Sequence, residues 1–252
     1  MSSLTLYNEV TAQSSKSTTL LYSSSFSSAI GLLDKSLHQS IYDIYGFVRF
    51  ADEIVDTFHE YDKATLLATF KADTYQALDN GISLNPILHR FQLTYNQFNI
   101  DRALLDAFLY SMEMDLSQQF HDQASYNQYI FGSAEVVGLM CLKIFCNGND
   151  AQYEALKPAA QSLGAAFQKV NFLRDIKADF VGMERMYFPN CDFTNFSLSD
   201  KQQIEADIQA DFDAALDGIK ALPLPCRFGV YVAFKYYYAL FNKIKQTNHT
   251  AL

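Results

Sequence analysis

Four polar residues in one stretch recur at the spacing of an α-helical turn. Between Tyr45 and Asp56 they are Tyr45, Arg49, Asp52 and Asp56. At about 100° per residue they fall within roughly 60° of one another on a helix, beside an apolar stripe of Ile44, Val48, Ala51 and Val55. Two Asp one turn apart repel by roughly 0.2–0.5 kcal/mol, and a carboxylate beside an apolar stripe loses hydration. A bound cation would make this arrangement favourable.

A second stretch, from Gln168 to Asp179, repeats the design far downstream. Its amide and acidic residues share a face within roughly 80° on a helix, and they are Gln168, Asn171, Asp175 and Asp179. Apolar residues, namely Val170, Leu173 and Ile176, are available for packing. We therefore predict two helices whose acidic faces oppose each other across a cavity.

The side chains of these two stretches suit a magnesium ion and a phosphate. Oxygen-only ligands are typical of Mg²⁺, which proteins usually hold with one or two carboxylates and substrate phosphate oxygens. Arg49 and Arg174 would bind the phosphates. A solvated acidic face is the alternative for each stretch alone. Together they predict Mg²⁺-dependent diphosphate chemistry.

Two further acidic pairs share the spacing without the same neighbours. Asp207 with Asp211 and Asp213 with Asp217 lie in a segment whose apolar stripe is formed by Ile208, Phe212, Leu216 and Ile219. We predict that this stripe is buried and that the acids face water.

The two stretches resemble the aspartate-rich motifs of the squalene and phytoene synthases. The second contains the core Asn-x2-Arg-Asp-x3-Asp. Four more segments resemble the family in order and spacing: Tyr22–Phe26, Met112–Asp115, Val137–Met140 and Arg185–Pro189. The resemblance covers residues from about 20 to 190, and it is closest to bacterial phytoene synthases.

The resemblance implies an all-α, isoprenoid-synthase-type helical bundle around a central cavity, as a single domain over residues 1–252. It implies head-to-head condensation of two prenyl diphosphates, first of geranylgeranyl diphosphate to phytoene through a cyclopropylcarbinyl diphosphate, in carotenoid biosynthesis. The implied metal ligands are Asp52, Asp56, Asn171, Asp175 and Asp179. The implied catalytic residues are the four Asp with Arg49 and Tyr45. The implied substrate-binding residues are Ser23, Ser25, Phe26, Arg49, Tyr129, Gln168, Asn171, Arg174, Arg185 and Tyr187.

The sequence departs from the family pattern at several positions. Ser24 stands where many relatives have Lys, Tyr22 where some have His, and Glu135 where many have Gly. Asp115 is an accessory polar residue of the implied cavity. Relatives usually continue for about one helix beyond Leu252, which leaves open whether the family's last helix is missing.

Composition favours a helical protein that does not bind nucleic acid. The 252 residues are 49% apolar and include only 10 Gly and 5 Pro, too few for an all-β fold. The net charge of −9 argues against a nucleic-acid partner. The cysteines show no Cys-x2-Cys spacing, so neither a zinc site nor a disulfide framework is predicted. The N-terminus has no basic segment followed by an apolar one, so no secretory signal is predicted. We expect a cytoplasmic protein with peripheral membrane contact for product release.

Apolar periodicity predicts helices over 36–58, 63–79, 86–99, 101–120, 158–180 and 204–222, and near the N-terminus over 1–16 and 18–33. Pro158 is expected in the first turn of its helix. The apolar run 129–146 is interrupted by Glu135 and Lys143, so it predicts a buried helix rather than a membrane span. Gly132 and Gly138 would let it kink or approach another helix closely. The aromatic face of 227–245 suits core packing, a channel wall or a membrane-facing patch.

Three alternatives stay open. A squalene or dehydrosqualene synthase would act on farnesyl diphosphate, the former with NADPH, whose dinucleotide fingerprint the sequence lacks. A terpene cyclase would use similar acidic helices on one substrate. A non-catalytic helical assembly protein could retain the same fold.

Overall fold

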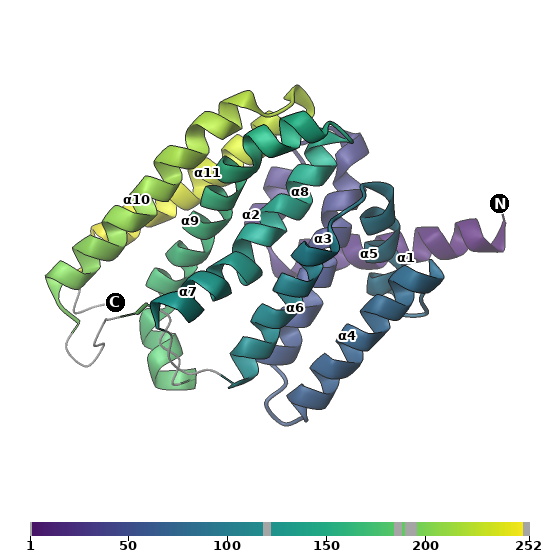
Figure 1. The fold of residues 1–252 in the computed structure, drawn as a ribbon, viewed down its shortest axis with the longest axis horizontal. Coiled ribbons are helices and arrows are strands. Elements are labelled where there is room, and N and C mark those ends of the chain that lie inside the picture. Colours follow the sequence, from purple (N-terminus) through teal and green to yellow (C-terminus); the bar gives the residue numbers. More distant parts are fainter. Residues whose placement is uncertain (1, 118–121, 184–187, 190–195, 249–252) are drawn as a thin grey trace.

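The computed structural model describes residues 2–117, 122–183, 188–189 and 196–248, without the side chains of 177–183. As predicted, these residues form helices joined by short turns, and none of them lies in a strand (Figure 1). The α-helices are α1 (Ser3–Tyr22), α2 (Ser24–Ile30), α3 (Lys35–Asp56), α4 (Lys63–Asn80), α5 (Pro86–Gln97), α6 (Arg102–Ser117), α7 (Gln123–Ile130), α8 (Val136–Cys146), α9 (Asp150–Met183), α10 (Leu198–Ala221) and α11 (Leu224–Lys245). One π-helical turn, η1 (Phe131–Glu135), joins α7 to α8.

Short polar residues set the helix boundaries in the first half of the chain. The Asp34 side chain accepts a hydrogen bond from the Ser36 N–H at 2.9 Å and caps α3. Helix α4 ends at Gly81, whose φ of 67° lies in the left-handed region that glycine adopts freely. Helix α5 begins after Asn85 with Pro86 in its first turn. These boundaries agree with the sequence prediction to within about two residues.

The predicted start of the second motif helix at Pro158 is wrong. Asn147 and Gly148 adopt positive φ values of 44° and 84°, and the chain turns there. The Asn149 Oδ1 then accepts the N–H of Gln152 at 3.0 Å, so α9 starts at Asp150. Pro158 therefore lies inside the helix, where it removes one backbone hydrogen bond. Packing of α9 against α8, η1 and α10 compensates this loss.

The N-terminal segment divides at a different place from the one predicted. Helix α1 continues to Tyr22, and Ser23 then separates it from α2. The Ser23 hydroxyl accepts the N–H of Phe26 at 3.2 Å and caps α2. One hydroxyl group thus explains why the chain forms two helices here.

The apolar run forms a helix in the middle of the bundle. The continuous helical stretch Gln123–Cys146 is long and apolar enough to cross a membrane by composition, yet 56% of its apolar window is buried inside the protein. As predicted, its glycines permit close contacts: a Cβ on Gly132 would lie 2.5 Å from the Ala107 carbonyl oxygen. From the other side Gly164 of α9 approaches the turn, where a Cβ would lie 2.7 Å from the Ala134 oxygen. The π turn is therefore held between α6 and α9.

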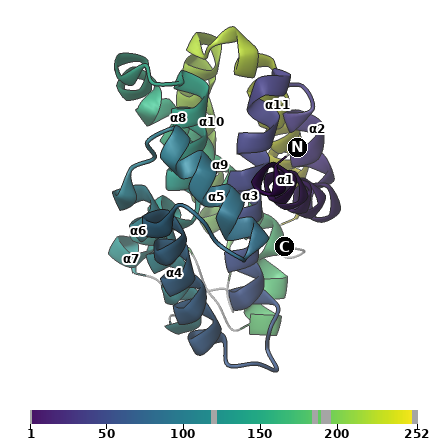
Figure 2. The same ribbon diagram turned by 90° about the vertical axis from the view of Figure 1, so that its right-hand side faces the viewer.

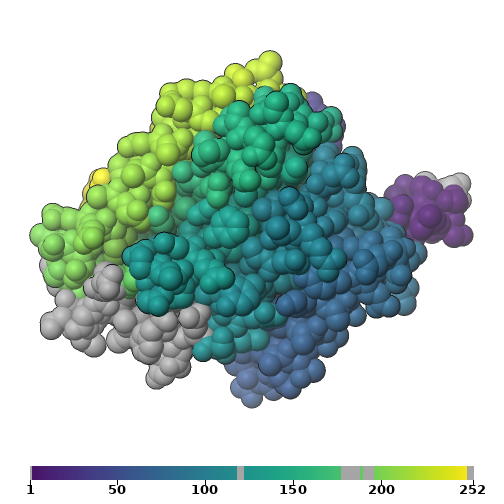
Figure 3. Space-filling view, in the orientation of Figure 1, coloured from purple at the N-terminus to yellow at the C-terminus, as the bar shows by residue number. Residues whose placement is uncertain are grey.

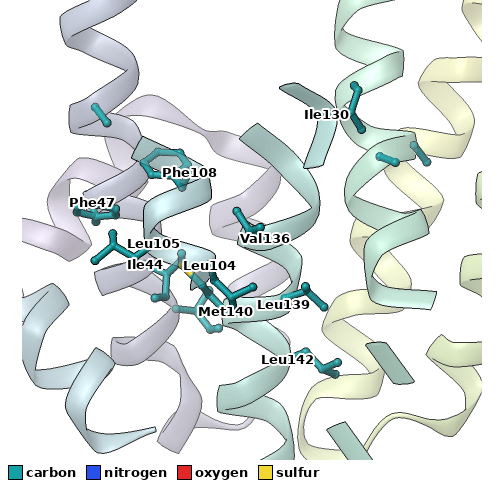
Figure 4. Packing of buried hydrophobic residues seen from close by; sticks show 14 of the residues in the cluster. Ile44, Phe47, Leu104, Leu105, Phe108, Ile130, Val136, Leu139, Met140 and Leu142 are labelled. Carbon is teal, nitrogen blue, oxygen red and sulfur yellow. The ribbon is translucent and has the colours of Figure 1, made fainter. Parts of the chain in front are cut away.

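The helices are arranged in the spatial order α10, α9, α8, α6 and α4, with α3 packed against this row (Figures 1 and 2). The buried apolar residues form one continuous cluster from α2 to α11. Its centre includes Phe47 of α3 (Figure 4). The Phe47 ring stacks on Phe91 of α5 at a centroid distance of 3.8 Å. This packing fixes α3, and with it the first acidic stretch, against α8 on one side and α5 on the other.

Candidate active site

A cavity of about 710 Å³ runs between the helices, and residues of α1, α2, α3, α6, α7, η1, α8, α9, α10 and α11 line it. Its lining changes along α3 from Ile41 and Ile44 to Asp52 and Asp56. Along α9 it changes in the same sense, from Leu156 and Leu163 to Asn171 and Asp175. The cavity thus has an apolar end and a polar end, and its volume lies in the range of about 300–1,000 Å³ that is usual for ligand sites.

As predicted, the first acidic stretch lines the cavity with Tyr45, Arg49, Asp52 and Asp56. The pKa of Asp52 is raised to about 8, mainly by burial and then by the charge of Asp56, with a smaller contribution from Asp115, while Arg49 opposes the rise. The two Asp also lie in the last turns of α3, where the helix dipole is negative. The surroundings of Asp52 therefore disfavour its negative charge, and a bound cation would stabilise it.

Arg49 is held in place by groups that the sequence analysis did not single out. Its guanidinium forms an ion pair with Glu53 and lies 4.5 Å from the centroid of the Tyr22 ring. Its Nε is buried and has no acceptor among the described residues. Within the described part of the chain, the Nε–H of the Arg49 guanidinium therefore remains as a donor for an anion in the cavity.

The second stretch also lines the cavity, with Gln168, Asn171, Arg174 and Asp175. Arg174 Nε donates to Asp175 Oδ1 at 2.7 Å, and both side chains are partly exposed. Burial raises the pKa of the Tyr237 hydroxyl, and the Asn171 side chain, which lies near that hydroxyl, lowers it. Asn171 Oδ1 is buried and accepts no hydrogen bond from the described residues. Three predicted site residues cannot be placed in this cavity. Arg185 and Tyr187 lie outside the described residues, and so does the side chain of Asp179.

A third carboxylate faces the first stretch from α6. The Tyr129 hydroxyl donates to Asp115 Oδ2 at 2.7 Å, and both side chains are buried and line the cavity. Asp115 is close enough to raise the pKa of Asp52. It therefore belongs to the polar end, as expected from the sequence, while Met112 of the same segment both packs in the core and lines the cavity.

The serine segment contributes to the site and to the helix boundary together. Ser23 and Ser25 line the cavity with their hydroxyl oxygens 3.3 Å apart, and Ser23 also caps α2. Phe26 packs against Tyr45 and Phe167, with centroid distances of 6.0 and 6.3 Å. The segment therefore forms a helix cap and part of the cavity wall at the same time.

The squalene/phytoene synthase family model matches residues 21–252. The chain belongs to the squalene/phytoene synthase family. Its similar relatives include a presqualene diphosphate synthase of Rhodopseudomonas palustris, 29% identical over 169 residues that cover 66% of this chain and 58% of the relative. A 4,4'-diapophytoene synthase of Staphylococcus haemolyticus is 27% identical over 193 residues, 75% of this chain and 66% of that protein. The chain thus matches less than two thirds of the length of these relatives.

Solved structures share the fold of this family. A dehydrosqualene synthase in complex with a ligand superposes with a TM-score of 0.83 at 19% identity, covering 95% of this chain and 87% of that one. A squalene synthase from Alicyclobacillus acidocaldarius gives a TM-score of 0.81 at 19% identity, covering 96% and 95%. The predicted isoprenoid-synthase-type bundle is therefore confirmed.

Two departures from the family pattern now have a structural setting. Ser24, which stands where many family members carry Lys, is exposed on the first turn of α2 and does not line the cavity. Glu135, which stands where many carry Gly, accepts a hydrogen bond from Gln161 at 2.8 Å. Burial raises the pKa of Glu135, while the bond to Gln161 lowers it. The carboxylate thus links η1 to α9.

The acidic pairs of α10 differ from each other. Asp213 and Asp217 are exposed, as predicted. The prediction that Asp207 and Asp211 simply face water is wrong, because Lys169 Nζ of α9 binds them at 2.6 and 2.7 Å. Lys169 is buried, and its pKa is raised by these bonds against the effect of burial. The pair joins α10 to α9.

The donors at the polar end fit a magnesium ion. They are carboxylate and amide oxygens, and Asn171 Oδ1, which accepts no hydrogen bond within the described part of the chain, is a suitable ligand. Among the described residues no three His, Cys, Asp or Glu side chains form a metal site by themselves. Mg²⁺ commonly takes only one or two carboxylates and completes its shell with water and phosphate oxygens. The oxygen set therefore suits a metal that arrives with a diphosphate.

Proposed function

We propose that this protein condenses two prenyl diphosphates head to head. The first candidate reaction converts two molecules of geranylgeranyl diphosphate to phytoene. One observation carries the proposal: at one end of a cavity whose other end is apolar lie Asn171 Oδ1 and Arg49 Nε, which have no hydrogen-bond partner among the described residues, and Asp52, whose ionised form is destabilised by burial. That arrangement separates a diphosphate end from a hydrocarbon end.

The polar end would bind the diphosphates. Asp52 and Asp56 on α3, with Asn171, Asp175 and the predicted Asp179 on α9, would hold Mg²⁺, and Arg49 and Arg174 would contact phosphate oxygens. Bound Mg²⁺ would stabilise the negative charge on the departing diphosphate. To contact a phosphate, Arg174 would have to break its hydrogen bond to Asp175. Metal binding by the Asp175 carboxylate would release Arg174 from this hydrogen bond.

The reaction would form one carbon skeleton from two. Diphosphate leaves the first substrate, and the double bond of the second attacks the allylic cation. Loss of one proton then gives a cyclopropylcarbinyl diphosphate, with one diphosphate released. A second ionisation, rearrangement and proton loss would give the triene.

The apolar walls would hold the prenyl chains and keep water from the cations. One aromatic wall is formed by Phe26, Phe167 and Tyr237. Within it the rings of Phe167 and Tyr237 stack with their centroids 4.0 Å apart. Electron-rich ring faces also stabilise nearby positive charge. Tyr129, fixed by its hydrogen bond to Asp115, would face the substrates at the boundary between the two ends.

The second candidate uses farnesyl diphosphate. It is favoured by the relatives, since those with 27–29% identity are named presqualene diphosphate synthase and diapophytoene synthase, whereas phytoene synthase 1 of Solanum lycopersicum is 25% identical over 254 residues. The side chains that close the apolar end would decide the chain length.

The test is turnover of geranylgeranyl diphosphate and, separately, farnesyl diphosphate, with Mg²⁺ or with EDTA and with or without NADPH. A C40 hydrocarbon without NADPH supports the first candidate, and a C30 product supports the second. A product with the substrate's own carbon number would indicate a cyclase. No diphosphate release from either substrate would contradict the proposal and favour an assembly role.

A further inference from the structure

Arg49 lies at the polar end of the cavity with its guanidinium held on two sides. The Nη2 atom forms an ion pair with Glu53, one helical turn further along α3. The ring of Tyr22 lies against the guanidinium, with its centroid 4.5 Å from Arg49 Cζ. The buried Nε–H has no acceptor among the described residues. In that part of the chain, Tyr22 and Glu53 thus fix the group without using its Nε–H.

The position of Tyr22 follows from the way α1 packs on α3. At about 100° per residue, Tyr22 lies within roughly 60° of the fully buried Ser15 and Thr19 on the surface of α1. A Cβ on Gly46 of α3 would lie 3.5 Å from Ser15 Cα, so the two helices come close there. Arg49 lies about one turn beyond Gly46. The register of α1 against α3 therefore brings Tyr22 to Arg49.

The chain turns immediately after Tyr22. Helix α1 begins in turns that stand clear of the body of the protein (Figure 3), and it ends at Tyr22. Ser23 follows in an extended conformation, and its hydroxyl caps α2. The Ser23 N–H donates to the Thr19 carbonyl oxygen at 3.1 Å. The junction is thus bonded to both helices, which gives the half-exposed Tyr22 ring a fixed place in the cavity lining.

A stacked ring holds a guanidinium without taking its hydrogen-bond donors. The negative face of the ring attracts the cation, while the N–H groups point outward in the guanidinium plane. A carboxylate in the same place would instead accept those N–H groups and compete with a phosphate for them. The Glu53 carboxylate pairs with Nη2 and is not part of the cavity lining. Tyr22 therefore supports Arg49 from the cavity side without occupying the Nε–H.

The two arginines of the site differ in their readiness to bind an anion. Arg174 Nε donates to the Asp175 carboxylate at 2.7 Å, so this hydrogen bond must break first. The Arg49 side chain is also less exposed than that of Arg174, at 28% against 47%. A group whose orientation is fixed before binding loses less conformational entropy when the ligand arrives. Arg49 is therefore the preorganised arginine.

We propose that Tyr22 is a positioning residue that holds the Arg49 guanidinium in the orientation that binds a diphosphate. This inference rests on the proposed function only in taking a diphosphate as the ligand. Some family members have His at this position, and a His side chain can carry a positive charge itself. A tyrosine is uncharged at neutral pH, so the Tyr22 ring acts on the anion through Arg49.

The experiment is calorimetric titration of the full chain with inorganic pyrophosphate in the presence of Mg²⁺. Tyr22→Leu removes the ring, and Tyr22→Phe keeps the ring without its hydroxyl. The matched control is Tyr75→Leu, because the Tyr75 ring lies against Arg102 at a similar distance of 4.4 Å, and neither residue lines the cavity. Circular dichroism and a thermal melt check that the variants are folded.

We expect Tyr22→Leu to raise the Kd for pyrophosphate by about three- to fivefold, the size of a cation–π contact at a partly exposed site. Tyr22→Phe and Tyr75→Leu should bind like the wild type. Absence of binding by the wild type, or equal binding by Tyr22→Leu, would overturn the proposal. A loss in Tyr22→Phe as large as that in Tyr22→Leu would assign the effect to the hydroxyl and would overturn it as well.

A double-mutant cycle tests whether Tyr22 acts through Arg49. In the Arg49→Gln chain no guanidinium remains to be positioned, so adding Tyr22→Leu should change the Kd by less than about 1.5-fold. An undiminished loss in that background would show that Tyr22 contacts the anion directly or supports the site in general. Either result would contradict the positioning role.

The outcome is separable from that of the proposed function. Product formation from prenyl diphosphates tests the reaction, whereas pyrophosphate binding tests the position of Arg49 without turnover. Binding that depends on the Tyr22 ring, with no product, would leave the positioning role standing and remove the reaction. Product formation with equal pyrophosphate binding by the wild type and Tyr22→Leu would do the opposite.

Discussion

The acidic pair on α3 and the acidic pair on α10 have the same spacing and different surroundings. Asp207 and Asp211 receive the ammonium of Lys169 at 2.6 and 2.7 Å. Asp52 has mainly acidic neighbours, with Arg49 as the opposing charge, and Arg49 itself forms an ion pair with Glu53. The fold therefore supplies a cation for one pair, and the other gains most from a cation that binds from outside.

The largest difference between the pairs should appear in turnover. Asp52→Ala, like Asp175→Ala, should reduce diphosphate release by about 10³-fold or more, because charge stabilisation of the leaving group is lost. Asp207→Ala should change it by less than about threefold, since Asp207 is exposed and lies outside the cavity. Steady-state kinetics on all three variants checks this, and near-normal activity of Asp52→Ala or Asp175→Ala would remove the metal assignment.

The second difference should appear in stability. Lys169→Met should lower the free energy of unfolding by about 2–4 kcal/mol, because it leaves the half-buried Asp211 without its cation. Lys169→Arg should recover most of the loss. Denaturant unfolding measures both, and a Lys169→Met chain as stable as the wild type would show that the α10 pair needs no cation.

A smaller effect should appear in the pH dependence of stability without metal. The pKa of Asp52 is about 8 in the folded chain against 3.8 ordinarily, so between these values the folded state retains a proton that the unfolded state releases. Stability from this group therefore falls as pH rises from about 4 to 8. In EDTA, Asp52→Asn should melt above the wild type at pH 8 by about 2–4 °C or more, and the gap should close near pH 4. A gap that does not depend on pH would contradict this.

The smallest effect should follow from adding a cation near the polar end. Ser24→Lys restores the residue that many family members carry, at an exposed position beside Ser23 and Ser25. We expect KM for the diphosphate to fall by about two- to fivefold with little change in kcat, since an exposed charge contributes modestly. Ser28→Lys, one turn further along the exposed side of α2, is the control and should leave KM unchanged.

The features that could be predicted from the sequence are those that depend on local helical periodicity and on turn residues. The spacing of Asp52 and Asp56, and of Asn171 and Asp175, placed both faces correctly on helices that share a cavity. Turn residues such as Asn80-Gly81 marked the breaks. These signals act within a few residues, so a single sequence contains them.

Contacts between helices could not be predicted in this way. Lys169 with Asp211 and Arg49 with Glu53 depend on the register of packed helices or on side-chain choice within the site. The same holds for the fully buried Asp43, whose two carboxylate oxygens accept hydrogen bonds from Arg90 and so join α3 to α5. The helix start predicted at Pro158 was wrong because local preference places proline in the first turn of a helix, whereas tertiary packing tolerates this proline inside α9.

Several predictions from the sequence stay predictions. They include the roles of Asp179, Arg185 and Tyr187, the single domain over residues 1–252, and the cytoplasmic location. The aromatic face of α11 is partly resolved: Phe234 and Phe241 are core residues, and Tyr237 lines the cavity. The expected membrane contact also stays a prediction.

The central claim is that the α3 pair, and not the α10 pair, is completed by an external cation. Its most direct test is thermal unfolding with Mg²⁺ and inorganic pyrophosphate together, for the wild type, Asp52→Asn and Asp207→Asn. Ligand at about 100 times its Kd should stabilise the wild type and Asp207→Asn by about 2.7 kcal/mol, a rise of several degrees in Tm, and should leave Asp52→Asn unshifted. An equal shift in Asp52→Asn, or its loss in Asp207→Asn, would contradict the account.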